Sequence, residues 1–292
     1  MKTIKLIGAS SFLGHSILKS SNSFLVETIN KNEYRYPIIP IESIVPNLLD
    51  SDIIILCSAA AVQPNNRSID SMIFGLNTFE PLRLIHLLSK HRYSGQLVTF
   101  GSYFSLGKNN LNQPVDESYT LGHTNDQPNS YCQSKHWLTR LSSINRKNGF
   151  DHLHLVLTNI YGPGENENRL FPYLKKSLAQ NEIPKVTSGE QYRQFTFVDD
   201  VAHFILNILK TSTSDGVYHF SNPDVIQVKD AIQRFYNTYN QTKKTHHNPE
   251  FGSIPSNRDS SMDYLALDCS KAFSSFGKPK FTSLTEGLKL YL

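Results

Sequence analysis

The sequence predicts an α/β fold in which a doubly wound parallel sheet of the Rossmann type carries a small carboxy-terminal lobe. Three observations support this class. Short apolar runs alternate with helical patterns up to Tyr161, a glycine-rich turn follows the first run, and the sequence becomes polar and rich in turn formers after Tyr161. Continuous β-branched runs separated by helices are typical of a parallel sheet covered on both faces.

The predicted elements alternate along the chain. We interpret as strands the apolar runs TIKLIG (3–8), FLVETIN (24–30), YPIIPI (36–41), DIIILCSAAA (52–61), GQLVTFGS (95–102) and LHLVLTNIYG (153–162). Helical patterns begin at about Ser11, extend from about Ile73 to His91, and surround Tyr131.

The part of the chain after Tyr161 is predicted to leave the sheet and return to it. QFTFVDDVAHFILNIL (194–209) indicates a strand followed by a helix, and YLALD (264–268) resembles a short strand. In doubly wound folds, ligands bind at the carboxyl edge of the sheet. We therefore expect a small lobe that closes over this edge, with a cleft between the two parts.

Composition and charge exclude several classes of function. Hydrophobic residues make up 39% of the chain and charged residues 18%, as in ordinary soluble globular proteins. The net charge of +4 is small and the basic residues are scattered, so we expect neither a nucleic-acid-binding face nor a membrane-binding face. No segment approaches the roughly 20 apolar residues that span a bilayer, and the start does not have the pattern of a signal peptide.

Three cysteines, Cys57, Cys132 and Cys269, are widely spaced and odd in number. This pattern argues against a disulfide framework and suits a reducing compartment. We expect buried thiols, no metal site and a cytoplasmic protein.

The glycine-rich turn KLIGASSFLG is the first candidate ligand site. Gly8 and Gly14 follow the first strand and open the first helix, where backbone N–H groups would hold a dinucleotide's pyrophosphate. Ser11 replaces the middle glycine of the usual spacing, and a tight turn without a ligand would use two glycines equally well. The predicted cofactor contacts are Gly8, Ser10, Ser11, Phe12, Leu13 and Gly14.

The end of the second strand bears on the choice of cofactor. An acid there binds the ribose hydroxyls of NAD, whereas a base accepts the extra phosphate of NADP. Asn30 and Lys31 stand near this point. The sequence therefore favours NADP(H), with NAD(H) possible and a merely solvated Lys31 as the alternative interpretation.

Tyr131 and Lys135 lie four positions apart in a predicted helix and so share one face. Using a tyrosine as an acid or base at neutral pH requires a pKa shift of about three units, roughly 4 kcal/mol. We expect Lys135 to lower the pKa of Tyr131 and to bind the nicotinamide ribose. Ser102 ends the preceding strand. The YxxxK spacing alone arises often on surface helices, but all three motifs in this order are improbable by chance.

Together these motifs resemble the extended short-chain dehydrogenase/reductases, a family of nucleotide-sugar epimerases, dehydratases and ketoreductases, over nearly the whole chain. ILCSAAA and NTFEPLRLIHLL match the segments with the alanine motif and Asn77. LTNIYGPG matches the segment with Asn159, RQFTFVDDVA matches the strand with Arg193, and NRDSSMDYLALDCSKA matches the tail with Arg258.

The resemblance implies roles for individual residues. Ser102, Tyr131 and Lys135 would be catalytic. Additional cofactor contacts would come from Ala59, Ala60, Asn77, Tyr131, Lys135 and Ile160. Substrate contacts would come from Ser102, Tyr103, Asn159, Arg193 and Arg258.

The resemblance also implies an organisation for the whole chain. Residues 1–160 plus 193–222 would bind the dinucleotide, and residues 161–192 plus 223–292 would form the nucleotide-sugar-binding lobe. A homodimer would form through the helices that contain Asn77 and Tyr131.

Within the family, the chain looks most like the 4-ketoreductases of the CDP-abequose synthase type. This implies NADPH-dependent reduction of the C4 ketone of a nucleotide-linked 4-keto-6-deoxyhexose or 4-keto-3,6-dideoxyhexose, with a CDP-sugar favoured, in bacterial surface polysaccharide biosynthesis. Tyr103 and Phe104 stand where a 4,6-dehydratase would carry Asp-Glu, and no cysteine lies near Ser102 as epimerase-reductases require. A C4 epimerase with bound NAD and a non-catalytic dinucleotide-binding sensor remain alternatives. Val156 departs from the family, since many relatives have arginine there.

Overall fold

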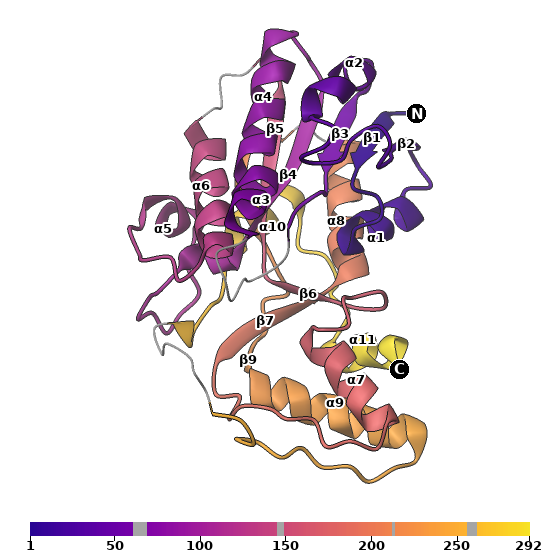
Figure 1. Cartoon of the computed structure of the whole chain (residues 1–292), viewed down its shortest axis with the longest axis vertical. Helices are drawn as coiled ribbons and strands as arrows, with labels where there is room; N and C mark the ends of the chain where they lie inside the picture. Colours follow the sequence, from indigo (N-terminus) through magenta and orange to yellow (C-terminus); the bar gives the residue numbers. More distant parts are fainter. Residues whose placement is uncertain (61–68, 145–148, 212–213, 256–261) are drawn as a thin grey trace.

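The computed structural model describes residues 1–60, 69–144, 149–211, 214–255 and 262–292. Its main sheet has six parallel strands in the order β2-β1-β3-β4-β5-β8 (Figure 1). These strands are β1 (Thr3–Ile7), β2 (Leu25–Ile29), β3 (Ile53–Leu56), β4 (Gln96–Ser102), β5 (Asp151–Leu157) and β8 (Gly216–Phe220). The predicted doubly wound parallel sheet is confirmed.

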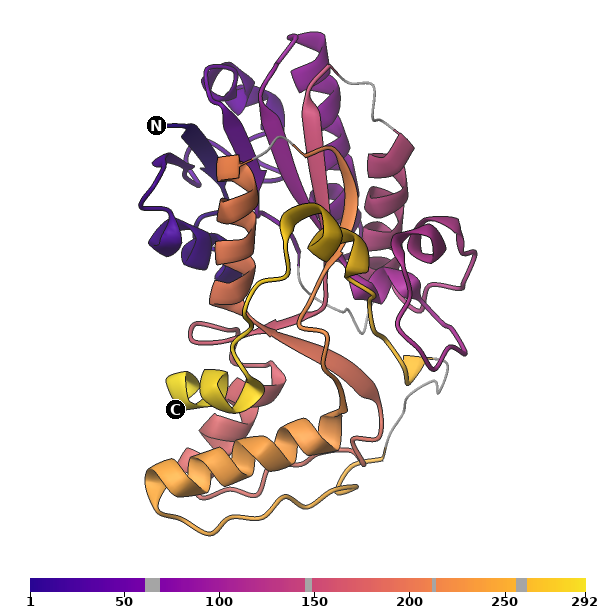
Figure 2. The ribbon, with the colours of Figure 1, turned by 180° about the vertical axis from the view of Figure 1, so that it is seen from behind.

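Helices cover both faces of this sheet, which explains why its central strands are apolar throughout. Ile53 and Ile55 pack with α1 (Phe12–Ser20) and α8 (Val198–Thr211), and α10 (Ser270–Phe276) covers β8 on this side. Ile54 and Leu56 pack against the opposite layer, α2 (Val45–Leu48) and α4 (Glu80–Lys90). Figures 1 and 2 show the two layers from opposite sides. A strand buried on both faces has no need of polar alternation.

The run YPIIPI, which we predicted to be a strand, is not one. It forms a turn closed by a single antiparallel bridge between Arg35 and Ile39, and the short helix η1 (Ile41–Ile44) follows. Pro37 and Pro40 have no N–H group to donate to a strand ladder, which explains the difference. Among the described strands, β2 therefore stands at the sheet edge and pairs only with β1.

The long helix predicted from Ile73 to His91 is present, but it is built from three consecutive pieces. α3 (Asp70–Phe74) leads into a π-helical turn, η3 (Gly75–Phe79), and then into α4. Asn77 lies within the π turn. Such turns occur often at functional sites because they redirect one side chain within a helix.

A smaller lobe carries the three-stranded sheet β6 (Asn159–Tyr161), β7 (Tyr192–Phe197) and β9 (Val225–Gln227). Helices α7 (Leu170–Ala179), α9 (Val228–Lys243) and α11 (Leu284–Tyr291) pack around it (Figure 2). Its core is aromatic and includes Tyr161, Phe171, Phe195, Phe197, Phe235, Tyr236 and Tyr291. The single strand predicted over 153–162 is thus divided between the two sheets, as β5 and β6.

The segment YLALD, predicted as strand-like, makes only isolated bridges, from Tyr264 to Tyr192 and from Leu267 to Val115. The side chain of Gln194 takes the place of a neighbouring strand: its amide donates to the carbonyl of Leu267 at 3.1 Å and accepts from its N–H at 2.8 Å. These contacts tie the chain's last quarter to β7.

The remaining described helices are α5 (Glu117–Gly122), α6 (Ser130–Ile144) and the short η4 (Tyr103–Leu106). The helix predicted around Tyr131 is α6. β7 belongs to the smaller sheet, whereas α8, which follows it directly, packs on α1. The predicted division into two domains stays an interpretation. None of the described helices is long and apolar enough to cross a membrane.

Candidate active site

The glycine-rich turn has the close backbone approaches that a dinucleotide-binding turn requires. Gly8 has a φ of +85°, and a Cβ on it would lie 2.6 Å from the backbone nitrogen of Ser58. A Cβ on Gly14 would lie 2.3 Å from the carbonyl oxygen of Gly8. Only glycine fits at either position without a shift of the backbone. The residues present therefore fit a nicotinamide dinucleotide.

Other residues of this turn have structural duties as well. Ser11, the departure from the glycine pattern, is the N-cap of α1, and its hydroxyl accepts a hydrogen bond from the N–H of Gly14 at 3.1 Å. Leu13 points into the core and Phe12 packs half-buried against it, while Ser10 is exposed. Because the side chain of Leu13 is buried in the core, only its backbone could contact a cofactor.

At the end of β2, the structure adds a carboxylate that the sequence analysis missed. Asn30 and Lys31 are exposed, as a contact to the ribose requires. The carboxylate of Glu33 accepts a hydrogen bond from the N–H of Asn30 at 3.0 Å. The turn thus carries both an acid suited to ribose hydroxyls and a base suited to a phosphate. The sequence signal that could have revealed this carboxylate was Glu33, an acid three residues after Asn30, which begins the turn.

Asn77 connects the loop after β3 to the helix of the tyrosine and lysine. Its side-chain amide accepts from the N–H of Ala60 at 2.8 Å and donates to the carbonyl of Ala60 at 3.0 Å and to the Ser134 hydroxyl at 3.1 Å. Ser134 in turn donates to the carbonyl of Tyr131 at 2.8 Å. Because these bonds occupy the amide, Asn77 acts here by fixing Ala60 beside α6. Ala59, its neighbour, is exposed.

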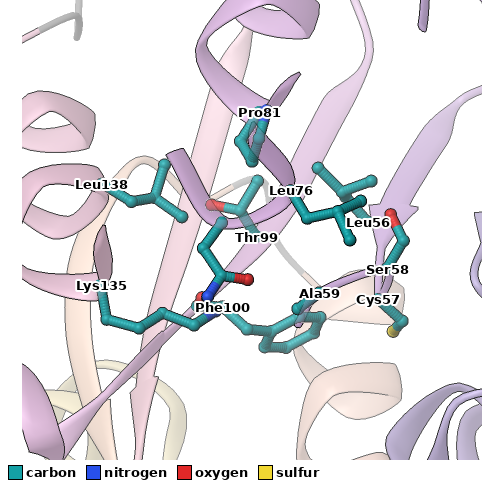
Figure 3. A pocket seen from close by; sticks show the side chains of 11 residues that line it. Leu56, Cys57, Ser58, Ala59, Leu76, Pro81, Thr99, Phe100, Lys135 and Leu138 are labelled. Carbon is teal, nitrogen blue, oxygen red and sulfur yellow. Dashed lines mark hydrogen bonds between the residues drawn. The ribbon is translucent and has the colours of Figure 1, made fainter. Parts of the chain in front are cut away.

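Ser102, Tyr131 and Lys135 meet at the carboxyl end of β4. The side chain of Ser102 lies beside the phenol of Tyr131 and lowers its pKa. The ammonium of Lys135 donates to the carbonyl of Phe100 at 3.0 Å, two residues before Ser102. Figure 3 shows the Lys135 side chain reaching Phe100 along the wall of a small cavity of about 30 Å³. The trio therefore spans one turn of α6 and the end of one strand.

The pKa values of the tyrosine and the lysine are set mainly by burial. Burial raises the pKa of Tyr131, and the neighbouring Ser102 hydroxyl and the charge of Arg169 offset only part of this rise. Lys135 is not among the groups that shift this pKa here, so its expected lowering of the Tyr131 pKa stays a prediction. Burial lowers the pKa of Lys135 to about 8. At neutral pH, Tyr131 is therefore a neutral phenol that can donate a proton.

A cavity of about 410 Å³ opens beside the trio and extends over the smaller lobe. Cavities of this size commonly bind small-molecule ligands. The ring of Phe104 lies in its wall and packs edge-on against Tyr131, with the ring centroids 6.2 Å apart. Its polar lining consists of Tyr103, Asn159, Tyr161, Glu165, Asn168, Arg169, Gln191 and Arg193.

Arg193 places a buried positive charge in the wall of this cavity. The residue is 7% exposed. Its guanidinium donates to the carbonyls of Tyr192 at 2.7 Å, Met262 at 2.9 Å and Asp263 at 3.1 Å. No carboxylate in the described part of the chain forms an ion pair with it. The second arginine expected here, Arg258, falls outside the described residues.

The structure reveals a second cation in the cavity, which the sequence analysis missed. Arg169 pairs with the carboxylate of Glu165 at 3.2 Å, and their side chains are 42% and 6% exposed. Burial raises the pKa of Glu165 to about 7, and the charge of Arg169 offsets part of that rise. The available signal was the Glu-to-Arg spacing of four residues within the turn-rich segment after Tyr161.

The other predicted substrate and cofactor residues also lie in the cavity wall. Tyr103 is 1% exposed, burial raises the pKa of its hydroxyl, and this hydroxyl has no hydrogen-bond partner among the described residues. Ile160 is half-buried against the main core.

Val156, which stands where many relatives have arginine, is fully buried in the apolar cluster around Tyr103. At this position the chain therefore has a packed apolar side chain in place of the arginine of many relatives.

The chain belongs to the NAD dependent epimerase/dehydratase family, which residues 41–221 match. The resemblance drawn from its motifs is thereby confirmed, and a nicotinamide dinucleotide is the cofactor of the family. The chain is 28% identical to CDP-abequose synthase of Salmonella typhimurium over 247 residues, which are 82% of this chain and 77% of that protein.

Solved structures share the fold over almost the full length. The enzyme RMD of Pseudomonas aeruginosa, complexed with NADPH, superimposes with a TM-score of 0.80 at 17% identity, covering 100% of this chain and 96% of that one. UDP-glucuronic acid 4-epimerase of Bacillus cereus, in complex with UDP-glucuronic acid and NAD, reaches 0.78 at 16% identity, covering 99% and 97%. At these identities the likeness extends to the fold alone.

Proposed function

We propose that this protein is an NADPH-dependent reductase of the C4 ketone of a nucleotide-linked 4-keto-6-deoxyhexose or 4-keto-3,6-dideoxyhexose. The observation that carries the proposal is that Ser102 lies beside the protonated phenol of Tyr131, next to a cavity that holds the buried cation Arg193. The similarity to CDP-abequose synthase supports a CDP-sugar and a place in bacterial surface polysaccharide biosynthesis.

The proposed chemistry divides into a hydride and a proton. The bound nicotinamide dinucleotide supplies the hydride. Tyr131 donates the proton to the oxygen that becomes the C4 hydroxyl, and Ser102 hydrogen-bonds to the same oxygen. Because burial keeps the pKa of Tyr131 high, its proton is present at neutral pH before the substrate binds. Lys135 provides a positive charge beneath the tyrosine.

The substrate's diphosphate suits the cavity's guanidinium groups. Arg193 has the planar fork that binds two phosphate oxygens at once, and its present partners are neutral carbonyls. Arg169 adds a more exposed cation on the same wall. We also propose that Lys31 gives a preference for NADPH, against which the nearby Glu33 carboxylate acts.

The function is tested by following NADPH oxidation with a set of 4-keto-6-deoxy sugar nucleotides that differ in base and in deoxygenation at C3. We expect turnover with at least one, fastest with a CDP-linked sugar and slower with NADH. Purified protein that carries bound NAD and interconverts C4 epimers without added cofactor would instead identify an epimerase. Tight dinucleotide binding without any turnover would identify a sensor.

The pH dependence of turnover should report Lys135. Its ammonium is protonated below its folded pKa of about 8 and loses its proton as the pH rises through that value. We therefore expect kcat/KM to fall by about tenfold per pH unit above the pKa of this group. Lys135→Arg keeps its charge across this range and should remove the fall, at a lower maximal rate. A wild-type profile that stays flat well above pH 8 would contradict this role.

We propose that two copies pair through the helices that contain Asn77 and Tyr131, which are η3 with its flanking helix α3, and α6. Large apolar side chains are exposed on the packed helices α3, η3 and α6: Trp137 is 43%, Phe79 57% and Ile144 72% exposed. Trp137 packs against Phe74 in a tilted arrangement, with the ring centroids 5.2 Å apart and the ring planes inclined by 38°. We expect sedimentation analysis to find a dimer that Trp137→Glu converts to monomers. Ile183→Glu, at a position 60% exposed elsewhere, is the control and should leave the dimer intact.

A further inference from the structure

A buried hydrogen-bonded bridge joins the three elements beneath the trio. On β5, the imidazole of His154 bonds through Nδ1 to the hydroxyl of Thr99 on β4 at 2.7 Å. Through Nε2 it bonds to the hydroxyl of Thr139 on α6 at 3.0 Å. His154 is 0% exposed, and both threonines are 1% exposed. One side chain thus holds the strand of Ser102 and the helix of Tyr131 together.

The bridge lies directly against Gly101, the residue before Ser102. A Cβ on Gly101 would lie 2.7 Å from His154 Nε2 and 2.8 Å from the Thr139 hydroxyl. The imidazole and the threonine therefore occupy the space above β4 that a side chain at Gly101 would fill. Thr139 stands one turn after Lys135, on the same face of α6. Thr99 lines the small cavity beside Lys135 (Figure 3).

We propose that His154 is a positioning residue that sets the distance between Ser102 on β4 and the Tyr131–Lys135 pair on α6. The inference rests on the proposed reductase function only for its kinetic test. A buried central strand of a parallel sheet normally carries apolar residues, and burying an imidazole is unfavourable unless both nitrogens find partners. The two bonds of His154 meet that requirement and at the same time hold α6 at a set distance from β4.

The imidazole of His154 is neutral when it forms these two hydrogen bonds. Burial, together with the nearby His152, Lys135 and His219, holds the pKa of His154 well below its usual value. One ring nitrogen then donates and the other accepts, and a threonine hydroxyl suits either. A neutral bridge leaves the ammonium of Lys135 without a second positive charge beside it.

His152 provides a matched control within the same strand. It is 3% exposed, and its Nε2 bonds to the same Thr99 hydroxyl at 2.7 Å. Unlike His154, it makes no bond to α6 among the described residues. Replacing either histidine with valine removes one buried imidazole and one bond to Thr99, but only His154→Val removes the connection to the helix.

We expect His154→Val to lower kcat by about 10- to 100-fold, the effect of misplacing reacting groups by about an ångström. KM and the dissociation constant for NADPH should change by less than about threefold, because none of the bridge residues is among the proposed substrate or cofactor contacts. His154→Gln keeps a donor near Thr139 and should recover most of kcat. If His154→Val fails to fold, the isosteric Thr139→Val breaks the same connection and should reproduce the loss.

A readout independent of turnover separates this inference from the proposed function. Crystal structures of the parent and both valine variants, grown with NADP⁺, should show a longer distance between the Ser102 and Tyr131 hydroxyls in His154→Val alone. Equal kcat per folded molecule in His154→Val and His152→Val, with unchanged hydroxyl distances, would overturn the positioning role. If the parent reduces no 4-keto sugar nucleotide, the distances still decide this question.

Discussion

Replacing Tyr131 with phenylalanine is expected to lower turnover by at least about 100-fold, the loss typical of removing a general acid. The phenol is the proton donor of the proposed reaction, and burial keeps it protonated at neutral pH. Phenylalanine retains the ring and its edge-on contact with Phe104, so the change removes little beyond the hydroxyl. Steady-state kinetics with a 4-keto nucleotide sugar would measure the loss, and NADPH fluorescence should show nearly unchanged cofactor binding.

A second tyrosine supplies the control for this experiment. Tyr173 on α7 accepts a hydrogen bond from the N–H of Lys185 at 2.8 Å and does not line the cavity. Tyr173→Phe should cost some stability and leave kcat close to that of the parent. Turnover of Tyr131→Phe within about tenfold of the parent would show that another group donates the proton.

Arg193→Gln is expected to raise KM for the nucleotide sugar by about 10- to 100-fold, since hydrogen bonds to a charged group contribute about 1.5–3 kcal/mol. The guanidinium is buried and, among the described residues, bonds to carbonyls and forms no ion pair, so an anionic ligand would complete its charge balance. Arg193→Lys keeps the charge but loses the planar fork and should give an intermediate KM. The dissociation constant for NADPH should not change in either variant.

The control for Arg193 must separate a general loss of charge from a loss in the cavity. Arg83 pairs with Glu42 on the surface, and its side chain is 56% exposed. Arg83→Gln removes the same charge and should leave KM unchanged. Because Arg193 also holds the backbone at Met262 and Asp263, Tm should be measured for each variant. An unchanged KM in a folded Arg193→Gln protein would exclude the proposed diphosphate contact.

The elements that the sequence predicts well are those whose signal is local. The run DIIILC is apolar on both faces, so β3 follows from burial alone, and Gly8 and Gly14 mark a turn that side chains would block. Ser102, Tyr131 and Lys135 could also be recognised as candidates, because each belongs to a motif within a single strand or helix. Such features can be predicted because periodicity and backbone sterics act within a few residues.

The errors arise where the choice of partner decides the outcome. YPIIPI has the apolar content of a strand, but Pro37 and Pro40 cannot donate to a neighbour. YLALD finds the side chain of Gln194 in place of a strand. The effect of Lys135 on the pKa of Tyr131 stays a prediction, because the ammonium points toward the carbonyl of Phe100, a direction that packing sets.

By itself, the sequence determined the class of fold, the dinucleotide turn and the candidates Ser102, Tyr131 and Lys135, since each depends on residues close together in the chain. Only the tertiary structure decided that Ser102 lies beside Tyr131, that Arg169 and Glu165 join the cavity, and that His154 bridges β4 to α6. Such contacts join residues far apart in sequence, and their geometry depends on how whole elements pack, which local patterns do not encode.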